Sequence, residues 1–177
     1  MQKQSLQRTK LGFLGVLFLT TACALPLNAV DSPKDKINKW INECPYIGLV
    51  AKEVTYGPIT LKHFDLEDKG RVVIAQPGET VSGSVNYKVD ASELESLHLH
   101  HIILGIKKSD DQTCLTHALG VWDSKGKATF SLAAPSERGA YEIRFDYQTG
   151  LKCEDALKHW NEDPPSSKAT VGIIIVE

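Results

Sequence analysis

The histidines of segment 97–101, Leu-His-Leu-His-His, are the side chains whose spacing is best suited to chemistry. On a β-strand, His98 and His100 project from one face and His101 from the other, because successive side chains alternate. Two imidazoles presented on one face suit zinc or copper. A third ligand could be supplied by one of three residues elsewhere in the chain: His117, His63 or Asp110. The spacing thus supports one hypothesis, a zinc or copper site on His98, His100 and His117.

Aromatic side chains offer a second kind of site, a platform on which a ligand stacks, as in secreted sugar-binding sandwiches. Its members would be Trp122, Tyr147, His159 and Trp160. Trp122 precedes a polar turn and is expected to be exposed. Trp160 lies on the apolar stripe of a short helix, so its ring is expected to be buried. Because amphipathic aromatics serve cores as readily as ligand sites, this platform stays a hypothesis.

Catalysis has little support in the residue pattern. The sequence contains no nucleophile elbow, phosphate-binding loop or metalloprotease helix. Its carboxylate pairs lie in polar, turn-like stretches, where solvated surface is the ordinary explanation: Glu93/Glu95, Asp110/Asp111 and Glu162/Asp163. We therefore expect a protein that is not an enzyme and needs no cofactor, unless the metal hypothesis holds.

Two short helices and a series of strands would position these residues. Apolar residues spaced i, i+3, i+4, i+7 predict one helix from Ile37 to Cys44 and another from Cys153 to Trp160. Turn signals and alternating apolar residues predict strands over Leu49–Leu61, broken by Gly57-Pro58, and over Arg71–Ala75, Thr80–Val89, Leu97–Lys107, Thr113–Val121, Lys127–Ala133, Ala140–Gln148 and Ala169–Val176. The second helix falls in the connection between the last two strands. Such a succession of short strands favours an antiparallel sandwich.

The stretch from Phe130 to Pro135, followed by Gly139 to Phe145, resembles the late strands of immunoglobulin-like and fibronectin-type sandwiches. In those domains a tyrosine opens the penultimate strand after a corner, as Tyr141 does here. The resemblance implies a mainly β, immunoglobulin-like fold and no active site. The connection from Gly150 to Ser167 departs from it, because it is long for a hairpin and contains a helix. Long connections are often functional, so this one is a candidate recognition surface.

The first 29 residues have the order of a secretory signal peptide: a basic start, an apolar run and a small-residue cleavage site. The apolar run, Leu11 to Ala24, is too short for a transmembrane span. We expect cleavage after Ala29, with cleavage after Ala24 or lipidation of Cys23 as alternatives. Residues 30–177 would then form one exported domain, periplasmic or extracellular.

Charge and cysteines add to this picture. Removing residues 1–29, with three basic residues and no acidic one, from a chain with 20 basic and 22 acidic residues leaves a net charge of −5. An acidic domain without a run of Lys or Arg is a poor candidate for nucleic acid or anionic membranes. In an oxidising compartment we prefer a Cys114–Cys153 disulfide, which closes a loop of about 40 residues and leaves Cys44 as a thiol.

The sequence thus predicts an exported, non-catalytic binding or accessory protein whose ligand is an unknown protein or carbohydrate. The alternative is a periplasmic zinc- or copper-binding protein that uses the H-x-H strand.

Overall fold

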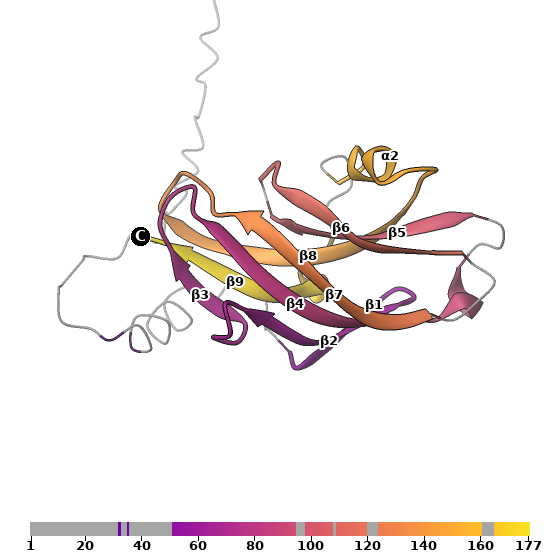
Figure 1. The fold of residues 1–177 in the computed structure, drawn as a ribbon, viewed down its shortest axis with the longest axis horizontal. Coiled ribbons are helices and arrows are strands. Elements are labelled where there is room, and N and C mark those ends of the chain that lie inside the picture. The colour runs from indigo at the N-terminus through magenta and orange to yellow at the C-terminus, as the bar shows by residue number, and fades with distance from the viewer. Residues whose placement is uncertain are drawn as a thin grey trace, which may run out of the picture.

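Two β-sheets packed face to face form the fold (Figure 1). The computed structural model describes Ser32, Asp35 and residues 51–94, 98–107, 109–119, 124–160 and 165–177. One sheet has four strands in the order β1-β2-β4-β7, and the other has five in the order β3-β9-β8-β5-β6. The prediction of a mainly β, sandwich-like domain is confirmed at this level.

Every predicted strand is present, with small differences in its ends. The strands are β1 (Glu53–Tyr56), β2 (Ile59–Leu66), β3 (Val72–Ala75), β4 (Thr80–Val89), β5 (Leu99–Ile106), β6 (Gln112–Leu119), β7 (Ser124–Ala133), β8 (Gly139–Thr149) and β9 (Thr170–Val176). Among the described residues from 51 onward, the helical segments are η1 (Ala91–Glu93), α2 (Cys153–Leu157) and η2 (Ser167–Ala169). The break at Gly57-Pro58 separates β1 from β2 as a hairpin.

Among the described strands, the pairing is antiparallel with one exception. β3 lies parallel to β9, with Val72 opposite Ile173, at the edge of the five-stranded sheet. Strand β3 therefore belongs to a different sheet from β2 and β4, its neighbours in sequence. The chain crosses between the sheets on either side of β3.

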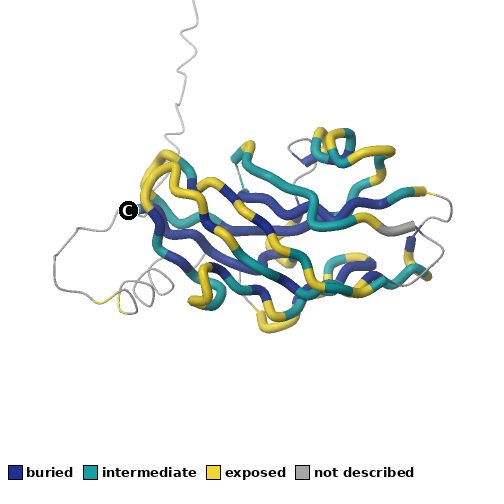
Figure 2. The backbone as a smooth tube through the Cα atoms, in the orientation of Figure 1, coloured by how far each residue is buried: buried dark blue, intermediate teal, exposed yellow. Residues whose placement is uncertain are grey.

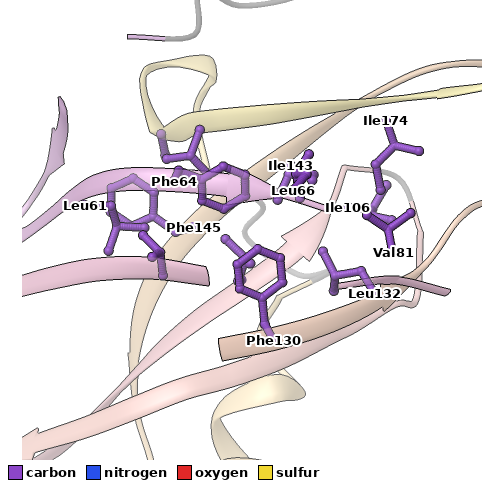
Figure 3. Close-up of a cluster of buried hydrophobic side chains, with 14 of the residues drawn as sticks. Leu61, Phe64, Leu66, Val81, Ile106, Phe130, Leu132, Ile143, Phe145 and Ile174 are labelled. Carbon is purple, nitrogen blue, oxygen red and sulfur yellow. The ribbon is translucent and has the colours of Figure 1, made fainter. Parts of the chain in front are cut away.

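The inner faces of the two sheets enclose one apolar core (Figure 3). Phe64 on β2 stacks on Phe130 of β7, with ring centroids 5.2 Å apart. Gly83 on the intervening strand β4 makes this stack possible, because a Cβ there would collide with the Phe130 ring. Phe145 and Ile143 of β8 approach from the opposite sheet.

Part of the outer face of the five-stranded sheet is covered by α2 and Trp160, which lie in the connection between β8 and β9. Helix α2 lies over β5 and β6 in Figure 1, and its Ala156 packs with Trp160 against Ile103. A disulfide joins Cys153 of α2 to Cys114 of β6. The predicted Cys114–Cys153 pairing is thus confirmed, and it fastens the connection to the sheet.

Several sequence predictions lie outside the described residues: the signal peptide, Cys23, and the first helix from Ile37 to Cys44. Ser32 and Asp35, which precede that helix in the sequence, are described. The Asp35 amide and the Ser32 hydroxyl are 3.3 Å apart, and the same hydroxyl donates to the Asp35 carboxylate at 2.6 Å. The first contact, from the Asp35 amide to the Ser32 side chain, is one of the two contacts of a capping box. Within the described part of the chain, no helix is long and apolar enough to cross a membrane.

Candidate functional site

The histidines predicted to form one site are divided between the two faces of the five-stranded sheet. His100 lies on the inner side with Tyr147, 6.2 Å between ring centroids, and His98 is 6.5 Å from His100. His117 is instead the direct cross-strand partner of His101, at 5.9 Å. The structure therefore brings His117 together with His101 and not with His98 and His100.

A β-bulge is the physical reason. Between β5 and β6 the register shifts, so that Ile102 faces Thr116 while Ile103 faces Cys114. The extra residue, Leu115, changes the alternation along β6. Cys114 and His117, three residues apart, therefore both pair with residues of the outer face, Ile103 and His101. In the part of the chain that the structure describes, no group of three His, Cys, Asp or Glu side chains is arranged to hold a metal ion.

The predicted aromatic platform is also separated. Trp160 is 1% exposed, and its ring covers Gly105 on the outer face of the sheet. Tyr147 packs against the inner core, on the opposite face. His159 is exposed beside Trp160, and Trp122 lies outside the described residues. Because the sheet stands between Tyr147 and Trp160, these two rings cannot contact one ligand together.

A buried charged network on β8 and β9 is bonded to the β8–β9 connection at Pro165. The Glu142 carboxylate accepts hydrogen bonds from Arg144, at 2.9 and 3.0 Å, and from the Thr170 hydroxyl. Arg144 also donates to the carbonyl of Pro165, at 2.6 Å. Burial alone would raise the pKa of Glu142, but these hydrogen bonds and the charges of Arg144 and Lys107 outweigh it and lower the pKa. The described parts of the connection, residues 150–160 and 165–167, are thus packed against or bonded to the sheet.

Four lysines gather on the outer face of the other, four-stranded sheet. Lys88 of β4 is the direct partner of Lys125 on β7, and Asn86 lies between Lys127 and Lys62 in the next row. Because side chains two residues apart share a face, the four lysines project from the same side of three adjacent strands. We call Lys62, Lys88, Lys125 and Lys127 the lysine face.

The positive charge of the lysine face is only partly balanced. Lys62 forms a salt bridge to Glu53 at 2.8 Å. Lys88 lies near Asp90, whose pKa is lowered mainly by hydrogen bonds from Ser92 and to a smaller extent by the charge of Lys88. Lys125 and Lys127 are exposed and have no salt bridge to any described acidic residue.

A groove of about 470 Å³ runs among these side chains. No acidic residue lines it; the lining residues are Lys62, Asn86, Tyr87, Lys88, Lys125, Gly126 and Lys127. Gly126 is the direct partner of Tyr87, and a Cβ on Gly126 would come within 2.7 Å of the Tyr87 hydroxyl. Exposed and less exposed positions alternate along β7 from Ser124 to Thr129 (Figure 2). The arrangement offers several ammonium groups and one amide to a ligand with acidic groups.

This face was missed at the level of sequence because its lysines are dispersed over 66 positions of the chain. The available signal was local: Lys125-Gly126-Lys127 is a K-x-K pair on a strand. Only the pairing of β2, β4 and β7 shows that Lys62 and Lys88 join that pair.

Comparison with known proteins adds no relative: neither a protein-family model nor a curated protein sequence matches this chain.

Proposed function

We propose that this protein is an exported, non-catalytic binding domain with an immunoglobulin-like fold, and that it recognises an acidic carbohydrate polymer through the lysine face. The observation that carries the proposal is the direct pairing of Lys88 with Lys125 beside Lys127. Like charges directly opposite each other destabilise a sheet. A cluster that opposes folding and opens onto a groove is better explained by binding than by stability.

Two features support the immunoglobulin-like assignment. The edge strand β3 runs parallel to β9 in a sheet of order β3-β9-β8-β5-β6, and the remaining strands form the opposing sheet. In addition, the Tyr141 hydroxyl donates to the Glu137 carbonyl at 2.9 Å, just before β8. A tyrosine at this corner, bonded back to the preceding backbone, is a hallmark of such domains.

Export rests on the N-terminal sequence and is supported by the Cys114–Cys153 disulfide, because structural disulfides persist in oxidising compartments. The intact mass of protein recovered from its host tests this part separately. Cleavage after Ala29 gives one mass, cleavage after Ala24 another, and a lipid on Cys23 a third. An uncleaved chain in the cytoplasm would contradict export.

An acidic carbohydrate suits the composition of the groove. Lysine ammonium groups act as point charges for carboxylates or sulfates, and the Asn86 amide can donate to and accept from hydroxyl groups. The groove offers no arginine for bidentate contacts with phosphate. A polymer of uronic acids combines regularly spaced carboxylates with hydroxyls and matches both features.

The test compares binding of polygalacturonate, neutral dextran and single-stranded DNA by the folded protein. Wild type should bind polygalacturonate and not dextran. The double variant Lys125→Gln/Lys127→Gln should bind about 2- to 30-fold more weakly, since each exposed charge contact contributes about 0.2–1 kcal/mol. Lys69→Gln, in an exposed turn, is the matched control and should bind like wild type.

Equal binding of dextran, or an unchanged affinity of the double variant, would overturn the proposal. Tighter binding of DNA than of polygalacturonate, lost in the double variant, would keep the site but contradict the carbohydrate assignment.

A further inference from the structure

We propose that His101 and His117 form a binding site for a borderline divalent metal ion, Cu²⁺ or Zn²⁺, on the outer face of the five-stranded sheet. This site is independent of the lysine face. It also differs from the H-x-H site expected from the sequence, because it uses adjacent strands and the opposite face.

The first support is the distance between the two rings. Imidazole nitrogens bind Zn²⁺ at about 2.0–2.1 Å. The centroids of two ligating rings are then roughly 5 Å apart when the rings meet the ion at a tetrahedral angle, and about 6.5 Å apart when they lie on opposite sides of it. The His101 and His117 centroids are 5.9 Å apart, inside this range. His98 and His100, at 6.5 Å, lie at its limit.

The second support is the hydrogen bond of His101 to the backbone. Its Nε2 lies 3.1 Å from the carbonyl oxygen of Gly150. A carbonyl oxygen only accepts, so Nε2 carries the proton and the neutral ring keeps Nδ1 as its ligating nitrogen. Metal-ligating histidines almost always donate their other ring N–H to a carboxylate, carbonyl or water in this way. Gly150 itself is fixed, since its amide donates to the Leu99 carbonyl at 3.1 Å.

Access and chemistry are consistent with such a site. His101 is 5% exposed, whereas its partner His117 is exposed, so one ligand is fixed and the other is open to solvent. The bulge at Leu115 brings His117 to the side of the sheet on which Cys114 is bonded to α2. Two protein ligands leave the remaining positions to water, which predicts a weak, exchangeable site. Imidazole is a suitable ligand for both ions, and Cu²⁺ binds more tightly in the general order of affinities.

The test titrates untagged, disulfide-intact protein with Cu²⁺ and follows binding by calorimetry and electron paramagnetic resonance. In the tightest phase of the titration, wild type should bind one Cu²⁺. The resonance spectrum of this Cu²⁺ should show hyperfine structure from two nitrogens. Removing an orienting partner of a metal ligand typically lowers affinity 10–100-fold, so loss of the ligand itself in His117→Gln should lower it at least about tenfold. His117 is exposed, so this variant should fold normally.

His98→Gln and His159→Gln are the matched controls and should keep the tightest phase unchanged. Loss of that phase in His98→Gln, or its survival in His117→Gln, would overturn the proposal. His101→Gln should also lose it, and thermal unfolding will show whether that buried substitution retains the fold. A two-nitrogen spectrum that persists in His117→Gln contradicts the site whatever the stability of His101→Gln.

Discussion

Replacing Lys125 by Gln should make the protein more stable while weakening its binding. Lys125 has two like-charged neighbours on the lysine face, Lys88 directly across and Lys127 two residues along β7. Ammonium groups about 7 Å apart in water repel by about 0.6 kcal/mol without screening. A Debye length of about 8 Å at 0.15 M salt reduces this to about 0.25 kcal/mol for each pair.

The expected gain in free energy of unfolding is therefore about 0.5 kcal/mol at 0.15 M salt. It rises to about 1 kcal/mol at 0.01 M salt and nearly vanishes at 1 M, because the Debye length changes from about 30 Å to about 3 Å. For a domain of this size, about 0.5 kcal/mol corresponds to a rise in melting temperature of roughly 1–2 °C. Urea unfolding at the three salt concentrations measures the effect, since urea adds no ions.

The matched control is Lys69→Gln, because Lys69 follows the acidic residues Glu67 and Asp68. Its removal relieves no lysine repulsion and should produce no gain at low salt. The reasoning is refuted if Lys125→Gln lowers stability, or if its gain is as large at 1 M as at 0.01 M salt. The first result would mean that the Lys125 side chain contributes to stability, and the second that the gain does not come from charge repulsion among the lysines.

Further predictions concern the β8–β9 connection and the ligand. Replacing Cys114 and Cys153 together by Ser should lower the free energy of unfolding by about 4 kcal/mol, as the chain-entropy model gives for a separation of 39 residues. Urea unfolding measures this loss, and a loss below about 1 kcal/mol would contradict the view that the disulfide fastens α2 to the sheet. Trp160→Ala should cost about 3–5 kcal/mol, because the ring is 1% exposed against the sheet, and an unchanged unfolding midpoint would show that the ring is dispensable. The folded-state pKa of Glu142 lies below its ordinary 4.5, so its contribution to stability is present at neutral pH and is lost as pH falls through that lowered value. Below about pH 4.5, wild type should thus lose more free energy of unfolding than Glu142→Gln. An equal dependence of this free energy on pH in both proteins would argue against the network. If three or four lysines contact the polymer, the affinity for polygalacturonate should fall about 20- to 50-fold between 50 and 200 mM salt, with the salt dependence known for single-stranded nucleic acid. An affinity that does not change with salt would exclude recognition by charge.

The strands were predictable because their signals are local. The alternation over Thr80–Val89 fixed the ends of β4, and the alternation of Tyr141, Ile143 and Phe145 identified the inner face of β8. The disulfide was predicted from the export signal and from the position of Cys114 and Cys153 in the larger C-terminal part of the chain. The strand predictions needed only side chains that are neighbours in sequence or periodicity.

The binding surfaces were not predictable, because they depend on pairing and irregularity. The lysine face exists only because β4 lies between β2 and β7, a neighbour relation that no single strand specifies. The sequence left the third metal ligand open among His117, His63 and Asp110, and the pairing of His117 with His101 depends on the bulge around Leu115, where the alternation along β6 fails. The parallel pairing of β3 with β9 likewise joins two segments about 100 residues apart.

The location of the ligand on the folded domain tests the central claim most directly. Chemical-shift mapping by NMR with a short oligogalacturonate should move the backbone amides of residues 86–88 and 125–127, and leave those of α2 unchanged. Shifts confined to the connection between Gly150 and Ser167 would instead make that segment the recognition surface and contradict binding at the lysine face.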